Sequence, residues 1–460
     1  MKKRSPLLLL LALLLSPLVA TGQFLEERAE EDYRHLADST DLSGWESLKF
    51  IPLNSRRTIY FSIGGSFRPR FEYLSNHFWI PGNDDTYYSQ KLSLHLALQL
   101  GQRLRLFGEW YHGLRSGEEE FLQSDLIDLH QGFVEWSITK SSTWALRLGR
   151  QEMKLGAGRL VDLRVGPNIR RSFDLARLLV DQESWSIDAF YGREVQIGFD
   201  AFDNRSGLFL EDNTNPDLWG IYGQFSLFAD EDVQDNTEIY YLGFRSPQAV
   251  FGDAMGEETR HSLGLRRYGT VGNRFRFNTE LIFQVGTLAD KTIRAFNFET
   301  DWKYTFVKGK GRPTIGLKLD WSSGDGQVGD DRLQSFNPMF VNPATYSLAA
   351  VNTPINLLSF HPSLTVFPHP KVLLLLDLAL FFRANDDDGL YAPPRIQTRP
   401  AAGLTARHIG NVIGLFVSYS LNSHWDFDIR TSYFTVGDFV ENSGDAEPIF
   451  QFASTISLTF

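Results

Sequence analysis

Basic side chains recur at alternate positions in stretches that otherwise carry large apolar residues. In the first such stretch Arg68, Arg70 and Glu72 share one parity, and aromatic residues occupy the other. A guanidinium group stays charged at physiological pH and binds a carboxylate through two parallel hydrogen bonds. A row of such groups can guide a carboxylate-bearing anion, because rings of Arg and Lys select anions in pores. The same parity argument on later stretches adds these candidate cations: Arg105, Arg147, Arg276, Lys318, Arg383 and Arg430.

The stretches that carry these cations alternate as β-strands do. Side chains of a strand point to opposite faces with a period of two, and a tilted strand crosses a bilayer in roughly 10 to 15 residues. Segments of this kind recur from residue 58 to the final stretch "FQFASTISLTF". We expect eighteen strands, at 58–73, 90–100, 103–113, 130–139, 143–152, 171–181, 184–200, 218–229, 237–246, 260–268, 273–286, 293–307, 312–323, 355–366, 371–384, 405–421, 424–436 and 447–460.

The connections between these segments alternate in length. Short turns such as 101–103 and 422–424 interleave with long polar segments such as 153–170 and 324–354. So many long loops are unusual in a soluble domain, whereas an outer-membrane barrel carries them on its extracellular side. The fold class that we predict is therefore all-β, a transmembrane antiparallel β-barrel with long extracellular loops and short periplasmic turns. Closure also removes the sheet edges that lipid cannot satisfy.

The N-terminus has the features of a secretory signal peptide. A basic start at Lys2, Lys3 and Arg4 precedes an apolar run that is too short to span a bilayer, and small residues follow. We expect a signal peptide over 1–22, a periplasmic segment over 23–56 and the barrel over 57–460. The acidic stretch "EERAEEDYRHLAD" fits either a short periplasmic helix or a plug. The expected location is the outer membrane of a Gram-negative bacterium.

Composition restricts the classes of partner and site. The chain has no cysteine, which excludes a lipid-anchored lipoprotein, disulfides and thiolate metal sites. The formal net charge is −11, so no nucleic-acid partner is expected. Downstream of the leader no apolar run reaches the length of a membrane-spanning helix. No cofactor, metal ion or catalytic residue is expected.

Several blocks of the chain resemble the alginate-export family of outer-membrane β-barrels, in the form found in bacteria of the Bacteroidota type. The most specific block is "LRLGRQEMKLGAGRLVDLRVGPNIRRSFDLARL" (146–178), and "IGGSFRPRFEY" (63–73) and "SSGDGQVGDDRLQSFNPMF" (322–340) support it. The resemblance covers nearly the whole chain beyond the leader. It implies a role in the pore constriction for Arg150, Arg159, Arg171 and Asp174. It also implies that the barrel-insertion machinery reads Phe460.

Strand parity qualifies one of these implied positions. Trp144, Leu146 and Leu148 read as lipid-facing, and strict alternation sends Arg150 outward with them. Arg150 then lies beyond the apolar band, or the strand contains a bulge there. Arg159 and Arg171 flank a long loop that can fold inward.

The expected function is a channel that passes an anionic polysaccharide, an alginate-like polyuronate, out of the cell through an arginine-lined lumen. An alternative is a passive uptake porin for small anionic solutes, since the same cations guide a monomer. A third interpretation is that arginine–carboxylate pairs, such as Arg70 with Glu72, only brace a polar wall. The partners expected are outer-membrane lipid and lipopolysaccharide, the barrel-insertion machinery and periplasmic export components.

An outer-membrane enzyme is the competing class. It needs a nucleophile, a base and an orienting group within mutual reach. His95 is expected to face inward beside Ser93, yet no nucleophile motif surrounds either residue. Acidic loop clusters at 83–85 and 385–389 contain ligands that suit Ca²⁺, but such clusters are more often simply solvated.

Overall fold

The computed structural model describes residues 24–460 apart from 40, 41, 43, 118–121, 140–142, 208–214, 230–232, 343, 345, 347 and 348. The predicted signal peptide and the turn at 140–142 lie outside the described residues. No helix in the described part of the chain is both long enough and apolar enough to cross a membrane.

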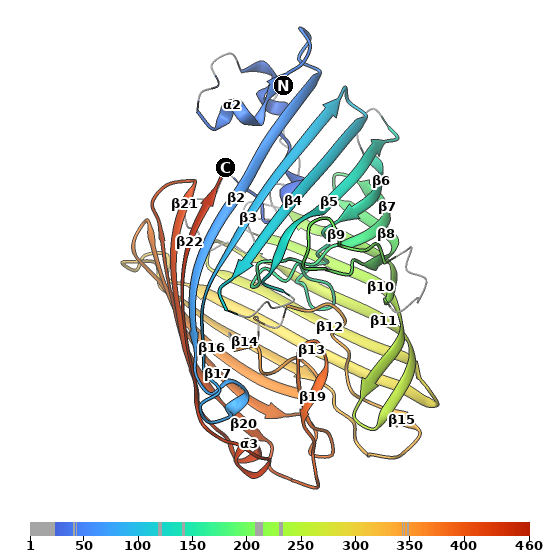
Figure 1. Cartoon of the computed structure of the whole chain (residues 1–460), viewed down its shortest axis with the longest axis vertical. Coiled ribbons are helices and arrows are strands. Elements are labelled where there is room, and N and C mark those ends of the chain that lie inside the picture. Colours follow the sequence, from blue (N-terminus) through green and yellow to red (C-terminus); the bar gives the residue numbers. More distant parts are fainter. Residues whose placement is uncertain are drawn as a thin grey trace.

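Within the described residues eighteen long strands form one antiparallel sheet that closes on itself (Figure 1). They are β2 (Ile59–Leu74), β3 (Asp85–Leu100), β4 (Leu104–Arg115), β5 (Asp125–Ser137), β6 (Trp144–Gln151), β7 (Phe173–Asp181), β8 (Trp185–Glu194), β9 (Asp217–Ala229), β10 (Val233–Phe251), β11 (Ala254–Val271), β12 (Phe275–Leu288), β13 (Lys291–Thr305), β14 (Thr314–Ser322), β16 (Leu357–His369), β17 (Val372–Arg383), β20 (His408–Ser420), β21 (Trp425–Phe434) and β22 (Ile449–Thr459). Each strand pairs with the next, and β22 pairs with β2 to close the barrel. Each of the eighteen predicted segments overlaps one of these strands.

Short strands and helical turns lie beside the barrel wall and in the loops. β1 (Ile51–Pro52) pairs with β2, β15 (Arg332–Leu333) lies parallel to β13, and β18 (Leu390–Ala392) pairs with β19 (Ile396–Arg399). The helical turns are η1 (Arg28–Glu30), η2 (Arg34–Asp38), α2 (Glu46–Lys49), η3 (His77–Trp79) and α3 (Asp438–Asn442). In Figure 1 the C-terminus and α2 lie at one end of the barrel, and α3, β15 and β19 lie at the other.

Strand alternation separates a hydrocarbon-facing surface from a polar interior. On β11 Leu263 and Leu265 are 59% and 51% exposed, whereas Ser262 and Arg266, which flank them, are buried. Because a bilayer solvates apolar side chains and the lumen solvates polar ones, the period of two appears in almost every strand. This is why sequence alternation located the strands.

Turn lengths follow the predicted alternation with one difference. The hairpins β10–β11 and β12–β13 close in two-residue turns at the long-loop end, and their strands extend beyond the predicted 237–246 and 260–268. Pro247 interrupts the strand pattern in the sequence, but the structure accommodates it at a register shift between Ser246 and Ala249. Proline is tolerated in sheets at such bulges.

Three segments fold into the barrel interior and narrow it. The N-terminal segment 24–50 lies against inward-facing residues of β2–β6 at the short-turn end, which we call the periplasmic end. The β6–β7 connection (152–172) and the β14–β16 connection (323–356) meet in the lumen through a parallel bridge between Val161 and Phe340. A buried apolar cluster that includes Phe173, Phe244 and Phe340 anchors both connections. The N-terminal acidic stretch therefore lies against the inner wall at this end of the barrel.

Candidate functional site

The inward-facing cations fall into three groups according to what they contact. The first group holds the N-terminal segment. Arg147 pairs with Glu30 at 2.6 Å, and Lys154 pairs with Glu26 at 2.9 Å. Arg105 donates to the carbonyl of Ala29, and Arg170 donates to the carbonyl of Glu26. These four cations are occupied by the chain itself.

The second group holds the β6–β7 connection inside the barrel. Arg68 donates to the carbonyls of Val165 and Pro167 at 2.9 and 2.8 Å, and Gly166 and Asn168 supply further acceptors. Arg70 donates to the carbonyl of Gly166 and pairs with Glu72 on its own strand. The guanidinium groups of β2 thus satisfy the carbonyls of residues 165–167.

Arg159 and Arg171 tie this connection to other parts of the lumen. Arg159 pairs with Glu299 of β13. Arg171 pairs with Glu194 of β8 at 2.8 Å and donates to the carbonyl of Phe340. Because each arginine bridges to a different element, the two of them fix the connection across the lumen.

The third group lines an open cavity of about 1010 Å³ in the periplasmic half of the barrel, along β11–β17 and β20. Its lining includes five cations and two acids, namely Arg266, Arg276, Lys303, Arg312, Lys318, Asp301 and Asp377. Lys303 pairs with Asp301 at 3.0 Å, and Arg266 pairs with Glu238 at 2.8 Å. Within the described residues neither Arg276 nor Arg312 forms an ion pair. The cavity is therefore a cationic space with unoccupied guanidinium groups.

Lys318 and Arg430 lie at the margins of this cavity. The Lys318 ammonium group is 3.8 Å from Glu299 and lies over the ring of Tyr346. The Arg430 guanidinium lies 4.5 Å from the ring centre of Phe416, which lines the cavity. Aromatic side chains thus accompany the cations, and Phe277 and Phe367 belong to the same lining.

A family model described as "Alginate export" matches residues 59–453. The chain belongs to the alginate export family. No curated protein sequence matches it. Among solved structures, Pseudomonas aeruginosa OccK2 (OpdF) in complex with glucuronate has a TM-score of 0.56 at 12% identity, over 86% of this chain and 98% of that one. Pseudomonas aeruginosa OpdK with vanillate also has a TM-score of 0.56, at 11% identity, over 86% and 98% of the two chains.

These structural matches establish that this member of the alginate export family has the fold of outer-membrane porins. At such low identity they show the fold alone. The family and its structural neighbours are channel-type barrels and not enzymes. Ser93 and His95 are the pair considered for the enzyme alternative. The Ser93 hydroxyl lies 2.8 Å from that of Ser66, while His95 stacks on Phe107.

Two predicted pore-lining positions, Arg150 and Asp174, are wrong. They pair with each other across β6 and β7 at 3.1 Å, on the parity of the exposed Trp144 and Leu148. The strict alternation of β6 therefore persists to its end and turns Arg150 to the outer wall. Arg193 pairs with Asp217 in the same outward row on the next two strands.

The predicted pore-lining position of Arg383 is also wrong. Its parity is inward, but its side chain is only 1% exposed and donates to the carbonyls of Leu404, Ala406 and Asp388. The residue ends β17 at the long-loop side, where the β17–β20 connection covers it. Arg383 therefore holds this connection and does not contact the cavity.

Further cations that are not among the predicted pore-lining residues also lie in the lumen. Lys303 and Arg266 share the inward parity of their strands, so the same alternation rule finds both. Arg312 lies in the β13–β14 turn, and Lys154 and Arg170 lie in the β6–β7 connection. No local pattern signals that these three side chains turn into the lumen.

One buried group in the described chain has donor atoms spaced for a metal ion. Single ligand atoms of Glu109, His130 and Glu152 lie within 4.8 Å of one another. The Nε2 atom of His130 is 2.8 Å from one carboxylate oxygen of Glu152, and Nη1 of Arg170 is 3.4 Å from the other oxygen of Glu152. Because Arg170 already compensates this carboxylate, we make no metal assignment.

Proposed function

We propose that this protein is an outer-membrane channel for uronate-containing anions, with an alginate-like polyuronate passing out of the cell as the principal solute. The observation that carries the proposal is the cavity along β11–β17, where Arg276 and Arg312 form no ion pair among the described residues. A guanidinium group without a partner in a water-filled space is available to a solute carboxylate. Family membership supports the polymeric substrate.

The aromatic side chains of the cavity support a sugar acid over a simple inorganic anion. Phe367 and Phe416 present apolar faces beside the cations. A uronate ring has an apolar face and a carboxylate, so both kinds of side chain find a partner on it. A chloride ion has no apolar face, so it interacts with the cations alone.

Passive uptake of small organic anions is the second candidate. The three inward-folded segments narrow the barrel, which suits small solutes. The two similar porins were solved with glucuronate and with vanillate, and both of these are carboxylates. Both candidate functions use the same cations and differ in the length of the solute.

Conductance across a planar bilayer tests the proposal. The double variant Arg276→Glu/Arg312→Glu should shift the reversal potential under a salt gradient from anion-selective toward cation-selective, because it inverts the local field. Arg294→Glu makes the same type of charge change on the exposed, outward parity of β13 and serves as the control. A native channel that prefers cations and is not blocked by oligouronates at low salt overturns the proposal.

Solute length separates the two candidates. Block of the native channel by oligouronates should strengthen steeply with the number of sugars if a polymer uses several cations at once. A monomer porin should bind glucuronate and longer oligomers with similar affinity. Measurements at low ionic strength are the most sensitive, because the Debye length then exceeds roughly 10 Å.

A further inference from the structure

The N-terminal segment is held in the barrel by side chains and not by the sheet. The backbone hydrogen bonds of residues 24–50 are local among the described residues, as in Glu31 to Arg28 and Leu36 to Tyr33. Its apolar contacts with the wall are those of Ala29 with Phe107 and Phe133 and of Phe50 with Tyr60. Its polar contacts with the wall are ion pairs and side-chain hydrogen bonds. Such contacts are screened by salt and can be replaced one at a time by another polar partner.

The segment presents carboxylates to the wall in the way that a polyuronate does. Glu26 and Glu30 are four residues apart and pair with Lys154 and Arg147, which lie on different elements. Arg147 contacts Glu30 and Glu135 together. The lumen thus binds two carboxylates of one short acidic segment through two separate cations.

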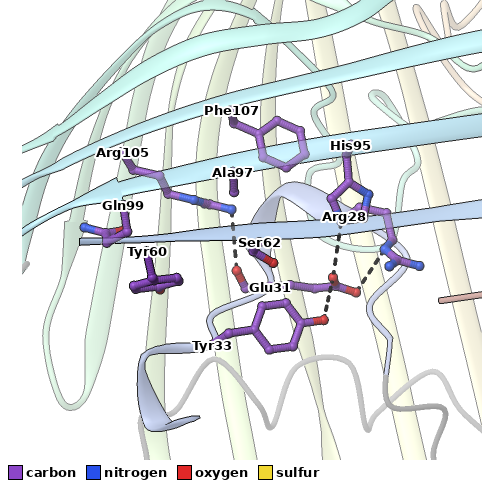
Figure 2. Close-up of a pocket in the computed structure, with 10 residues that line it drawn as sticks. All are labelled: Arg28, Glu31, Tyr33, Tyr60, Ser62, His95, Ala97, Gln99, Arg105 and Phe107. Carbon is purple, nitrogen blue, oxygen red and sulfur yellow. Dashed lines mark hydrogen bonds and ion pairs between the residues drawn. The ribbon is translucent and has the colours of Figure 1, made fainter. Parts of the chain in front are cut away.

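The fit between the segment and the wall is close. Figure 2 shows Glu31 between Arg28, Tyr33 and His95, with Arg105 and Phe107 on the barrel side. The space that remains there is about 10 Å³, which holds at most a single water molecule. A solute carboxylate therefore reaches Arg105 only after the segment has moved.

We propose that Arg105, Arg147, Lys154 and Arg170 form a second carboxylate-binding site, which the acidic N-terminal segment occupies in the resting channel and the transported uronate chain occupies after displacing it. This inference rests on the proposed function. The segment acts as a tethered competitor whose effective concentration is in the millimolar range typical of short linkers. A monomeric anion competes poorly against it, whereas a polymer that engages several cations competes well.

Thiol labelling of the segment tests this inference directly. The native chain has no cysteine, so Ala29→Cys supplies the only thiol. Ala29 is buried against Phe107 and Phe133 while the segment is docked. An oligouronate should accelerate labelling by a bulky maleimide severalfold, and a neutral malto-oligosaccharide of the same length should not.

Charge variants of the segment provide the matched comparison. In the Ala29→Cys background, Glu26→Gln/Glu30→Gln should raise the labelling rate about tenfold without any oligouronate, because two ion pairs with the wall are lost. Glu46→Gln removes an exposed carboxylate on α2 and should leave the rate unchanged. Equal rates in the two variants overturn the inference.

The outcomes distinguish this inference from the proposed function. If oligouronates block an anion-selective current but leave the labelling rate of Ala29→Cys unchanged, the segment is not a competitor and the channel function stands. If the Glu26→Gln/Glu30→Gln channel prefers cations and ignores oligouronates, both proposals fail. Faster labelling together with anion-selective block supports both.

Discussion

Arg147 lies between two carboxylates, with Glu30 of the N-terminal segment at 2.6 Å and Glu135 of β5 at 2.5 Å. The Arg147 side chain is only 3% exposed. One guanidinium therefore joins the barrel wall to the segment. Its removal affects both the stability of the barrel and the docking of the segment.

Arg147→Met should destabilise the protein by about 3 kcal/mol, because it leaves Glu135 largely buried without its cation. Glu30→Gln should cost about 1 kcal/mol, because Glu30 is partly exposed. Urea unfolding followed by tryptophan fluorescence in lipid vesicles measures both values. The double variant should be less destabilised than the sum of the two single variants, since these residues share an interaction. Additive effects would contradict the direct contact.

Docking of the N-terminal segment should weaken as the pH rises from about 4.5 to 8. Burial, together with the neighbouring carboxylates of Glu30 and Glu152, raises the pKa of Glu27 to about 8, although Arg177 and Lys154 oppose the shift. Within this range Glu27 is protonated when docked and ionised when released, so rising pH favours release. Above pH 8 Glu27 is ionised in both the docked and the released segment, so a further rise in pH no longer weakens docking through this residue.

Glu30 has the opposite dependence at lower pH. Burial tends to raise its pKa, but Arg147 outweighs burial and lowers the pKa to about 2. Its contribution to docking is present above the ordinary pKa near 4.5 and is lost as the pH falls toward 2. Docking should therefore be strongest near pH 4.5 to 5. The labelling rate of Ala29→Cys, divided by that of Ala29→Cys/Glu27→Gln at each pH, should rise between pH 5 and 8, and a flat ratio would refute this assignment.

Arg68→Lys should release the 165–168 turn from the wall of β2. The guanidinium donates to three backbone carbonyls and the Asn168 side chain, and an ammonium group cannot reach the same set in one geometry. We expect docking of the turn to weaken by about 2 kcal/mol. Single-channel recordings should show higher and noisier conductance. Arg70→Lys is the control, because Arg70 donates to one carbonyl of the turn, and an equal change in both variants would contradict the role of Arg68.

Epitope tags test the orientation of the barrel. Gly82 and Gly403 lie in exposed turns at the long-loop end, and a side chain at either position would meet no atom within 4 Å. Tags there should bind antibody on intact cells. Tags at Gly101 and Gly272, in open turns at the opposite end, should bind only after the outer membrane is permeabilised. Staining at Gly272 with none at Gly403 would reverse the topology.

Sequence alternation predicted the strands because lipid and lumen impose opposite demands on successive side chains. It also placed Arg276 and Lys318 on the inward parity, and both line the cavity. It did not predict which cations are open to a solute, because that depends on segments folding into the lumen from far along the chain. Arg68 appeared free in the sequence, yet residues almost one hundred positions away cover it. The prediction for Arg383 is wrong for the same reason, because the β17–β20 connection covers this side chain at the long-loop end of the barrel.

The docked segment and the open cavity occupy different parts of the wall, β2–β6 for the segment and β11–β17 for most of the cavity. A small anion that enters the cavity meets Arg276 and Arg312 without disturbing Glu30. A polymer long enough to reach both walls has to compete with the segment. Under the proposed mechanism the outer membrane would keep a constant permeability to small anions, and only long chains would change the state of the protein that carries them.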